Sequence, residues 1–198
     1  MKKIILASGS PRRRELMKLT DLDFEVITSD CDEHTDASSP EETAAGLSRL
    51  KCLSVAEGIM SGNIHPSDES SEGYIVIGAD TIVALDGCIL GKPVNEEDAF
   101  RMLSMLSGKM HTVHTGVTIY DTGSGMNTTF TDQTDVEMYE LDEKEIREYI
   151  STKEPMDKAG SYGIQGRGGL LVKRIIGDYF NVVGFPVARL SRELKQFL

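Results

Sequence analysis

The chain has 198 residues, of which 21 are Lys or Arg and 32 are Asp or Glu, so its formal net charge is −11. This length suits one domain or two closely packed lobes, and we expect a single domain over residues 1–198. The acidic balance argues against a polymeric nucleic acid partner, and no apolar run is long enough for a membrane span or a secretion signal, so we expect a cytoplasmic protein.

The first predicted elements are a short buried strand at residues 4–7 and a helix over about 11–19. Between them, the turn Ser8-Gly9-Ser10 exposes backbone N–H groups at the helix start, where anions bind. Ser10 can cap this helix, and Pro11 suits its first position. Residues 1–18 hold six Lys and Arg against one acid. This pattern favours a phosphate site, and a plain strand–helix junction with solvated arginines is the alternative.

A strand is predicted at 24–28, followed by an acidic stretch over 29–38. Glu33 is one of three acids in four residues there, and its carboxylate could bind a hard divalent cation or simply be solvated. Ser39 then caps a helix that reaches about Glu57. Lys51 lies on this helix, and the pattern does not say whether it points inward. Residues 61–73 are predicted to form a mobile surface loop.

The apolar run at 74–79 predicts a central strand that ends at Asp80. Because ligands of α/β sheets gather beyond the carboxyl ends of strands, Asp80 is placed to bind a metal or activate water, or else to cap a turn. A hairpin follows, with strands at 82–85 and 88–90. Lys92 comes next between Gly and Pro, where it could neutralise a phosphate or be an ordinary loop lysine.

The remaining segments complete a mixed α/β pattern. They are a helix from Asn95 to about Gly108, an antiparallel pair of strands at 110–121 and 127–140, a helix over 142–151, a glycine-rich loop over 160–169, strands at 170–176 and 179–183, and a helix after Pro186. The edge of the long strand pair is a candidate for pairing with a second copy, which would give a homodimer. Gln165, in the glycine-rich loop, carries an amide that suits a uracil or thymine edge.

Five blocks of this chain, in this order, resemble the Maf family of nucleoside triphosphate pyrophosphatases: LASGSPRR at 6–13, GADT at 78–81, GKP at 91–93, DKAGSYGIQG at 157–166 and VVGFP at 182–186. The resemblance implies an elongated mixed β-sheet flanked by helices, with two lobes and a central cleft. It also implies hydrolysis of a nucleoside triphosphate between its α and β phosphates, with a divalent cation, Mg²⁺ or Mn²⁺, in a house-cleaning role.

The resemblance also assigns roles to single residues. Asp80 matches the general base proposed for the family, although the sequence does not decide between a base and a metal ligand. Five residues match its phosphate and metal pocket: Ser8, Arg13, Glu33, Lys51 and Lys92. Arg12, Thr81 and Gln165 match positions of the branch that prefers dTTP and UTP over methylated GTP.

The main alternative is a nucleotide-binding regulator of septum formation that does not turn its ligand over. The enzyme is favoured because a pure binder has no use for an acid, Asp80, among cations. A covalent phosphatase is not supported, since no Gly-x-Ser-x-Gly elbow is present, and Gly91-Lys92 lacks the glycine spacing of a P-loop. The enzyme hypothesis requires that Arg13 and Asp80 face one shared cleft.

Overall fold

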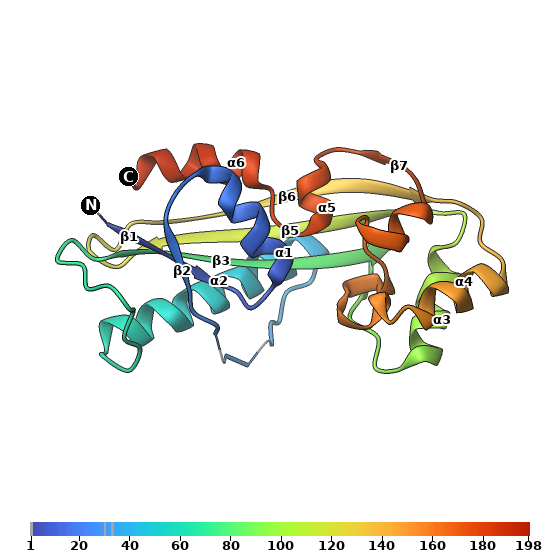
Figure 1. Cartoon of the computed structure of the whole chain (residues 1–198), viewed down its shortest axis with the longest axis horizontal. Helices are drawn as coiled ribbons and strands as arrows, with labels where there is room; N and C mark the ends of the chain where they lie inside the picture. Colours follow the sequence, from blue (N-terminus) through green and yellow to red (C-terminus); the bar gives the residue numbers. More distant parts are fainter. Residues whose placement is uncertain (1, 30, 33) are drawn as a thin grey trace.

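A computed structural model describes residues 2–29, 31–32 and 34–198. Its centre is a mixed sheet with the order β2-β1-β3-β5-β6-β7, and β4 pairs with β3 beside this path (Figure 1). The strands are β1 (Lys3–Ala7), β2 (Phe24–Val26), β3 (Tyr74–Leu85), β4 (Cys88–Leu90), β5 (Met110–Asp121), β6 (Asn127–Met138) and β7 (Val172–Ile176). β1 is parallel to β2 and β3, and the other pairs are antiparallel.

Helices flank this sheet. They are α1 (Pro11–Met17), α2 (Pro40–Met60), α3 (Glu96–Leu106), α4 (Glu143–Ser151), α5 (Tyr179–Val183) and α6 (Val187–Glu193), with short 3₁₀ segments η1 (Lys18–Thr20), η2 (Glu154–Asp157), η3 (Ala159–Ser161), η4 (Gly166–Leu170) and η5 (Leu194–Gln196). The predicted helix starts are confirmed: the side chains of Ser10, Ser39, Asn95 and Asp142 each accept a backbone N–H from the first turn. In the described residues, no helix is both long and apolar enough to cross a membrane.

The molecule is elongated because β3, β5 and β6 run through both of its ends (Figure 1). One end, the amino-terminal lobe, carries β1, β2, α1, α2 and α6, and its core includes Leu6, Met17 and Leu190. The other end, the distal lobe, carries α3, α4, β7 and the η2–η4 segments, and its core includes Leu103 and Ile150. The expected fold, a mixed sheet flanked by helices, is confirmed.

β3 differs from the prediction in a way that shapes the site. It does not end at Asp80, as predicted, but continues unbroken to Leu85. The reason is its long antiparallel partner β5, which pairs Asp80 with Gly116 and Thr81 with Thr115, so the ladder supports polar residues in mid-strand. On the opposite side of β3, β1 pairs only with residues 74–78 and β4 only with 83–85. Residues 79–82 therefore form a gap in the sheet on that side.

One other prediction is wrong. Residues 179–183 form α5 and not a strand, because Asp178 caps the helix start and Gly184, with a φ of 113°, ends it. A short apolar run fits either structure, and here the capping residues decide. Of the two long strands, β5 lies inside the sheet, between β3 and β6. On the outer side of β6, residues 127–134 have no strand partner within the described part of the chain.

Candidate active site

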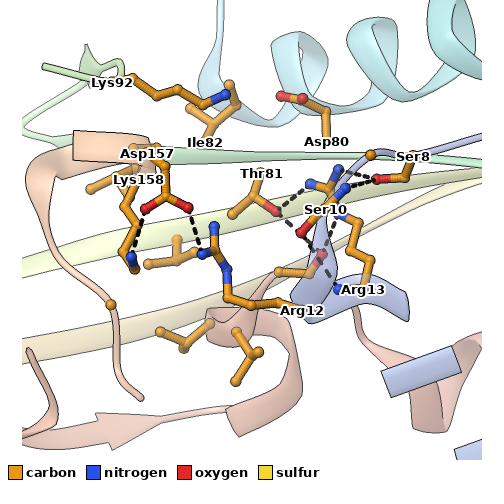
Figure 2. A pocket seen from close by; sticks show the side chains of 18 of the residues that line it. Ser8, Ser10, Arg12, Arg13, Asp80, Thr81, Ile82, Lys92, Asp157 and Lys158 are labelled. Atoms are coloured by element: carbon orange, nitrogen blue, oxygen red, sulfur yellow. Dashed lines mark hydrogen bonds and ion pairs between the residues drawn. The ribbon is translucent and has the colours of Figure 1, made fainter. Parts of the chain in front are cut away.

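The gap in the sheet opens into a cavity of about 660 Å³, which we call the central cleft. This volume lies within the range of small-molecule sites. Its walls come from the turn after β1, from β3, from α2, from the loop after β4 and from residues 157–165. The cleft reaches both faces of the sheet: Asp80 and Lys92 lie on one side of β3, and Thr81, Arg12 and Arg13 lie on the other (Figure 2).

Two glycines set the position of α2 above the cleft. A Cβ on Gly78 of β3 would lie 2.5 Å from the carbonyl oxygen of Ser48, and one on Gly116 of β5 would lie 2.2 Å from that of Ala44. Side chains at these positions would push the helix away from the sheet. Because both are glycine, α2 packs directly on the strands, and Lys51 is brought over Asp80. The direction of Lys51 was left open by the sequence, and the structure turns it inward.

Lys51 and Asp80 form a close ion pair. The Nζ of Lys51 lies 2.5 Å from Oδ1 of Asp80, and the two side chains are 14% and 13% exposed. Such an ion pair is less screened than one at the surface. Oδ2 of Asp80 accepts no hydrogen bond from the residues that the structure describes, so it is the oxygen open to a ligand. Asp80 is therefore a carboxylate with one oxygen fixed and one available.

The hydrogen bonds of Arg13 differ from those expected of a residue that binds phosphate, because they go to protein groups. Its Nε donates to the Gly184 carbonyl at 2.9 Å, and its Nη1 donates to the Ala79 carbonyl at 2.8 Å. The guanidinium also donates to the hydroxyls of Ser8, at 3.3 Å, and Thr81, at 3.0 Å. Arg13 thus joins α1, β3 and the α5 end into one rigid wall, and it contributes its charge to the cleft.

Arg12 spans the mouth of the cleft between the lobes. Its Nη1 lies 2.9 Å from Oδ2 of Asp157, and Nζ of Lys158 lies 2.6 Å from the other oxygen, Oδ1 (Figure 2). Burial acts to raise the pKa of Asp157, but the hydrogen bonds from Lys158 and Arg12 outweigh it and hold that pKa below its usual value. Asp157 is therefore a carboxylate at pH 7, with both oxygens bound to cations.

Part of the cleft wall is apolar. It includes Val83, Leu90, Val113, Tyr162 and Val182, which belong to the core of the distal lobe or pack against it. The Tyr162 hydroxyl lies 2.7 Å from Nε2 of His111, which is buried under it. Burial lowers the pKa of His111 to about 4, so the imidazole is neutral at pH 7. An uncharged wall of this kind suits the flat face of a nucleobase.

Cations outnumber acids around the cleft. Among the described residues, its lining holds five cations, Arg12, Arg13, Lys51, Lys92 and Lys158, and two carboxylates, Asp80 and Asp157. The local formal charge is therefore +3, in a chain whose net charge is −11. The chain as a whole repels anions, but the positive charge of the cleft attracts them locally. This favours a small and strongly anionic ligand.

The cleft gathers almost every residue that the sequence suggested. Eight of them line it: Ser8, Arg12, Arg13, Lys51, Asp80, Thr81, Lys92 and Gln165. Arg13 and Asp80 share the cleft, as the enzyme hypothesis requires. Glu33, the expected metal ligand, lies outside the described residues. Asp157 and Lys158 also line the cleft without having been predicted as site residues, although an acid followed by a base at the start of a glycine-rich loop was a visible signal.

An α/β fold with a cationic cleft at a gap in its sheet defines a protein that binds a small phosphorylated ligand. The chain belongs to the Maf family, since the family model described as Maf-like protein matches residues 3–197. It is 50% identical over 198 residues to proteins named dTTP/UTP pyrophosphatase from Bacillus cereus strains G9842 and B4264. The alignments cover 100% of this chain and 96% of each relative. A protein of the same name from Bacillus thuringiensis subsp. konkukian (strain 97-27) is equally similar.

Proposed function

We propose that this chain is a nucleoside triphosphate pyrophosphatase that hydrolyses dTTP and UTP to the monophosphate and pyrophosphate. The observation that carries the proposal is the convergence of a carboxylate, Asp80, and five cations in one cleft with a formal charge of +3. The names of the relatives, at 50% identity over the full chain, support the same reaction and the same nucleotides. The removal of unwanted nucleotides, a house-cleaning role, follows from this activity.

The triphosphate would lie among the cations of the cleft. Lys51 approaches from α2, Lys92 from the loop after β4, and Arg12 from α1. Their charges would stabilise the negative charge that grows on pyrophosphate as it leaves. Phosphoryl transfer depends mainly on such positioning and electrostatic stabilisation, and preorganised cations supply both.

Asp80 would act on the attacking water. Lys51 holds Oδ1 at 2.5 Å, which fixes the orientation of the carboxylate and presents Oδ2 to the cleft. From this position, Oδ2 can orient a water molecule toward the α phosphorus and accept its proton. General-base assistance of this kind contributes about 10²–10⁴ in rate.

A divalent cation, Mg²⁺ or Mn²⁺, fits this site in part. The described residues contain no group of three or more His, Cys, Asp and Glu side chains that could hold a metal by themselves. Mg²⁺ does not need such a group, because it commonly binds one or two carboxylates together with substrate phosphates. The predicted Glu33 would hold the cation, and binding by Asp80 is the alternative to its role as general base. When bound, the cation would neutralise phosphate charge and assist the departure of pyrophosphate.

The pyrimidine base would lie against the uncharged wall of the cleft. Gln165 also lines the cleft and can pair, through its amide, with an edge that carries both a donor and an acceptor. The Thr81 side chain is fixed by hydrogen bonds, since its hydroxyl accepts from Arg13 and lies 3.0 Å from the hydroxyl of Thr115. With Arg12, these residues are the proposed determinants of dTTP and UTP preference.

The test is pyrophosphate release by the purified protein with dTTP, UTP, CTP, GTP, ATP and 7-methyl-GTP. We expect turnover of dTTP and UTP in the presence of Mg²⁺ or Mn²⁺ and its loss with EDTA. No release from any nucleotide would favour the non-catalytic regulator, and a preference for 7-methyl-GTP would contradict the assigned base determinants. A cytoplasmic location and a homodimer through the outer edge of β6 are also part of the proposal.

A further inference from the structure

Arg12 and Arg13 are neighbours in sequence, but the structure uses them differently. Arg13 donates to the carbonyls of Ala79 and Gly184 and to the hydroxyls of Ser8 and Thr81. Arg12 donates to a single group within the described residues, Oδ2 of Asp157. A guanidinium has five N–H donors in a rigid, planar arrangement. Arg12 is therefore held at one end and keeps its remaining donors for a ligand.

The anchor of Arg12 is itself fixed. Lys158 occupies the second oxygen of Asp157 at 2.6 Å and donates to the backbone carbonyl of Glu154 at 2.5 Å. The Glu154 carboxylate in turn accepts the backbone N–H of Arg167, at 3.1 Å, in the glycine-rich loop. Asp157 thus belongs to a hydrogen-bonded network that continues into the loop carrying Gln165, on the distal lobe.

This network crosses the cleft. Arg12 lies on α1 in the amino-terminal lobe, whereas Asp157 ends η2 in the distal lobe. The two residues are 145 positions apart in sequence, and their ion pair lies at the edge of the same cavity. The orientation of Arg12 toward a ligand therefore depends on a residue of the opposite lobe.

We propose that Asp157 is a positioning residue, which holds the Arg12 guanidinium in the orientation that recognises the nucleotide. The inference rests on the proposed function. Asp157 acts through Arg12 and does not take part in bond cleavage. Its loss would release Arg12 to swing away from the cleft, and errors of about 1 Å in such a group can cost on the order of 10²-fold in rate.

The test is a double-mutant cycle with Arg12→Ala, Asp157→Asn and the combined variant, measured as pyrophosphate release from dTTP and CTP. We expect Asp157→Asn to lower kcat/KM for dTTP by roughly 10- to 100-fold, mainly through a higher KM, and to lower the dTTP-to-CTP ratio. The combined variant should be no worse than Arg12→Ala. Wild-type activity in Asp157→Asn, or losses that multiply in the combined variant, would overturn the inference.

Glu137→Gln is the matched control. Glu137 also binds two cations, Lys173 at 2.8 Å and Arg174 at 2.5 Å, but it lies on β6 away from the cleft lining. The Glu137→Gln variant should keep the activity and the selectivity of the wild type.

Asp157→Glu is a second variant that retains the carboxylate, so it tests the inference even if Asp157→Asn does not fold. It should keep most of the selectivity. A Glu variant as unselective as Arg12→Ala would count against positioning, and a wild-type protein without pyrophosphate release would overturn the proposed function itself and this inference with it.

Discussion

Nζ of Lys51 lies 2.5 Å from Oδ1 of Asp80, although the two residues belong to a helix and a strand that are separated by the loop at 61–73. The pair is mostly shielded from water, and no hydrogen bond to the other carboxylate oxygen comes from the residues that the structure describes. A cation directly beside a reactive carboxylate keeps that carboxylate in place without blocking it. This arrangement leads to the first prediction.

Replacement of Asp80 by Asn should abolish most turnover and leave the fold intact. The amide has the shape of the carboxylate, but it cannot accept a proton from water, so kcat should fall by about 10²–10⁴. Initial rates with dTTP, the melting temperature and calorimetric binding of dTTP would measure this. Asp86→Asn is the control, since Asp86 lies in the exposed turn between β3 and β4 with a φ of 51°, which Asn also tolerates. Near-normal turnover by Asp80→Asn would exclude the proposed role.

Replacement of Gly78 by Ala should weaken both the fold and the site. The new Cβ would lie 2.5 Å from the Ser48 carbonyl oxygen and 2.6 Å from the Cys52 nitrogen, so α2 must move. Overpacking of this kind costs about 1–3 kcal/mol, and the shift carries Lys51 away from Asp80. Urea unfolding gives the stability, and Gly91→Ala, which meets nothing within 4 Å, is the reference for it. Equal stability of the two variants would contradict the close packing of α2.

Protonation of Asp121 should make the protein less stable in acid. Burial acts to raise the pKa of this carboxyl, but hydrogen bonds from Lys2 and Ser124 outweigh it and lower the pKa to about 2. Because the folded-state pKa is below the unfolded one, the contribution is present above about pH 4 and is lost as the pH falls toward 2. It amounts to about 2 kcal/mol. Urea unfolding at several pH values should show Asp121→Asn less stable at pH 7 and equal to the wild type near pH 2; a constant difference would refute this account.

His111 should add a second pH effect at milder acidity. Its pKa falls from 6.5 to about 4 on burial, so the folded protein binds fewer protons than the unfolded chain between these values. The contribution of His111 to the free energy of unfolding is therefore fully present above about pH 6.5. It declines as the pH falls toward 4, by about 3 kcal/mol in all. Unfolding free energies of His111→Gln should lack this decline. A His111 imidazole that titrates near 6.5 in an NMR pH series would disprove the assignment.

The local features of this fold were predictable from sequence. Two helix starts were predicted from capping residues, Ser39-Pro40 for α2 and Asp142 with Glu145 for α4. Such prediction works because a capping side chain and the N–H donor that it satisfies are only a few residues apart. The cleft residues were also found, since they cluster at short motifs that follow strands. Their roles in the reaction stay predictions.

Features that depend on distant partners were not predictable. The continuity of β3 through Asp80 comes from its ladder with β5, some 35 residues further along the chain. Similarly, the inward direction of Lys51 depends on the absence of side chains at Gly78 and Gly116. The bracing role of Arg13 required carbonyl groups of residues 79 and 184, which no local pattern connects to it.

The gap between β1 and β4 also bears on aggregation. It leaves four residues of β3, 79–82, without a strand on one side, over a length of about 13 Å. An open strand edge normally invites pairing with another polypeptide. This one is bounded at both ends by β1 and β4, so it admits a molecule of nucleotide size but is too short to template a foreign strand. In addition, the Ala79 carbonyl at one end of the gap already accepts from Nη1 of Arg13, so this short edge carries little risk of edge-to-edge association.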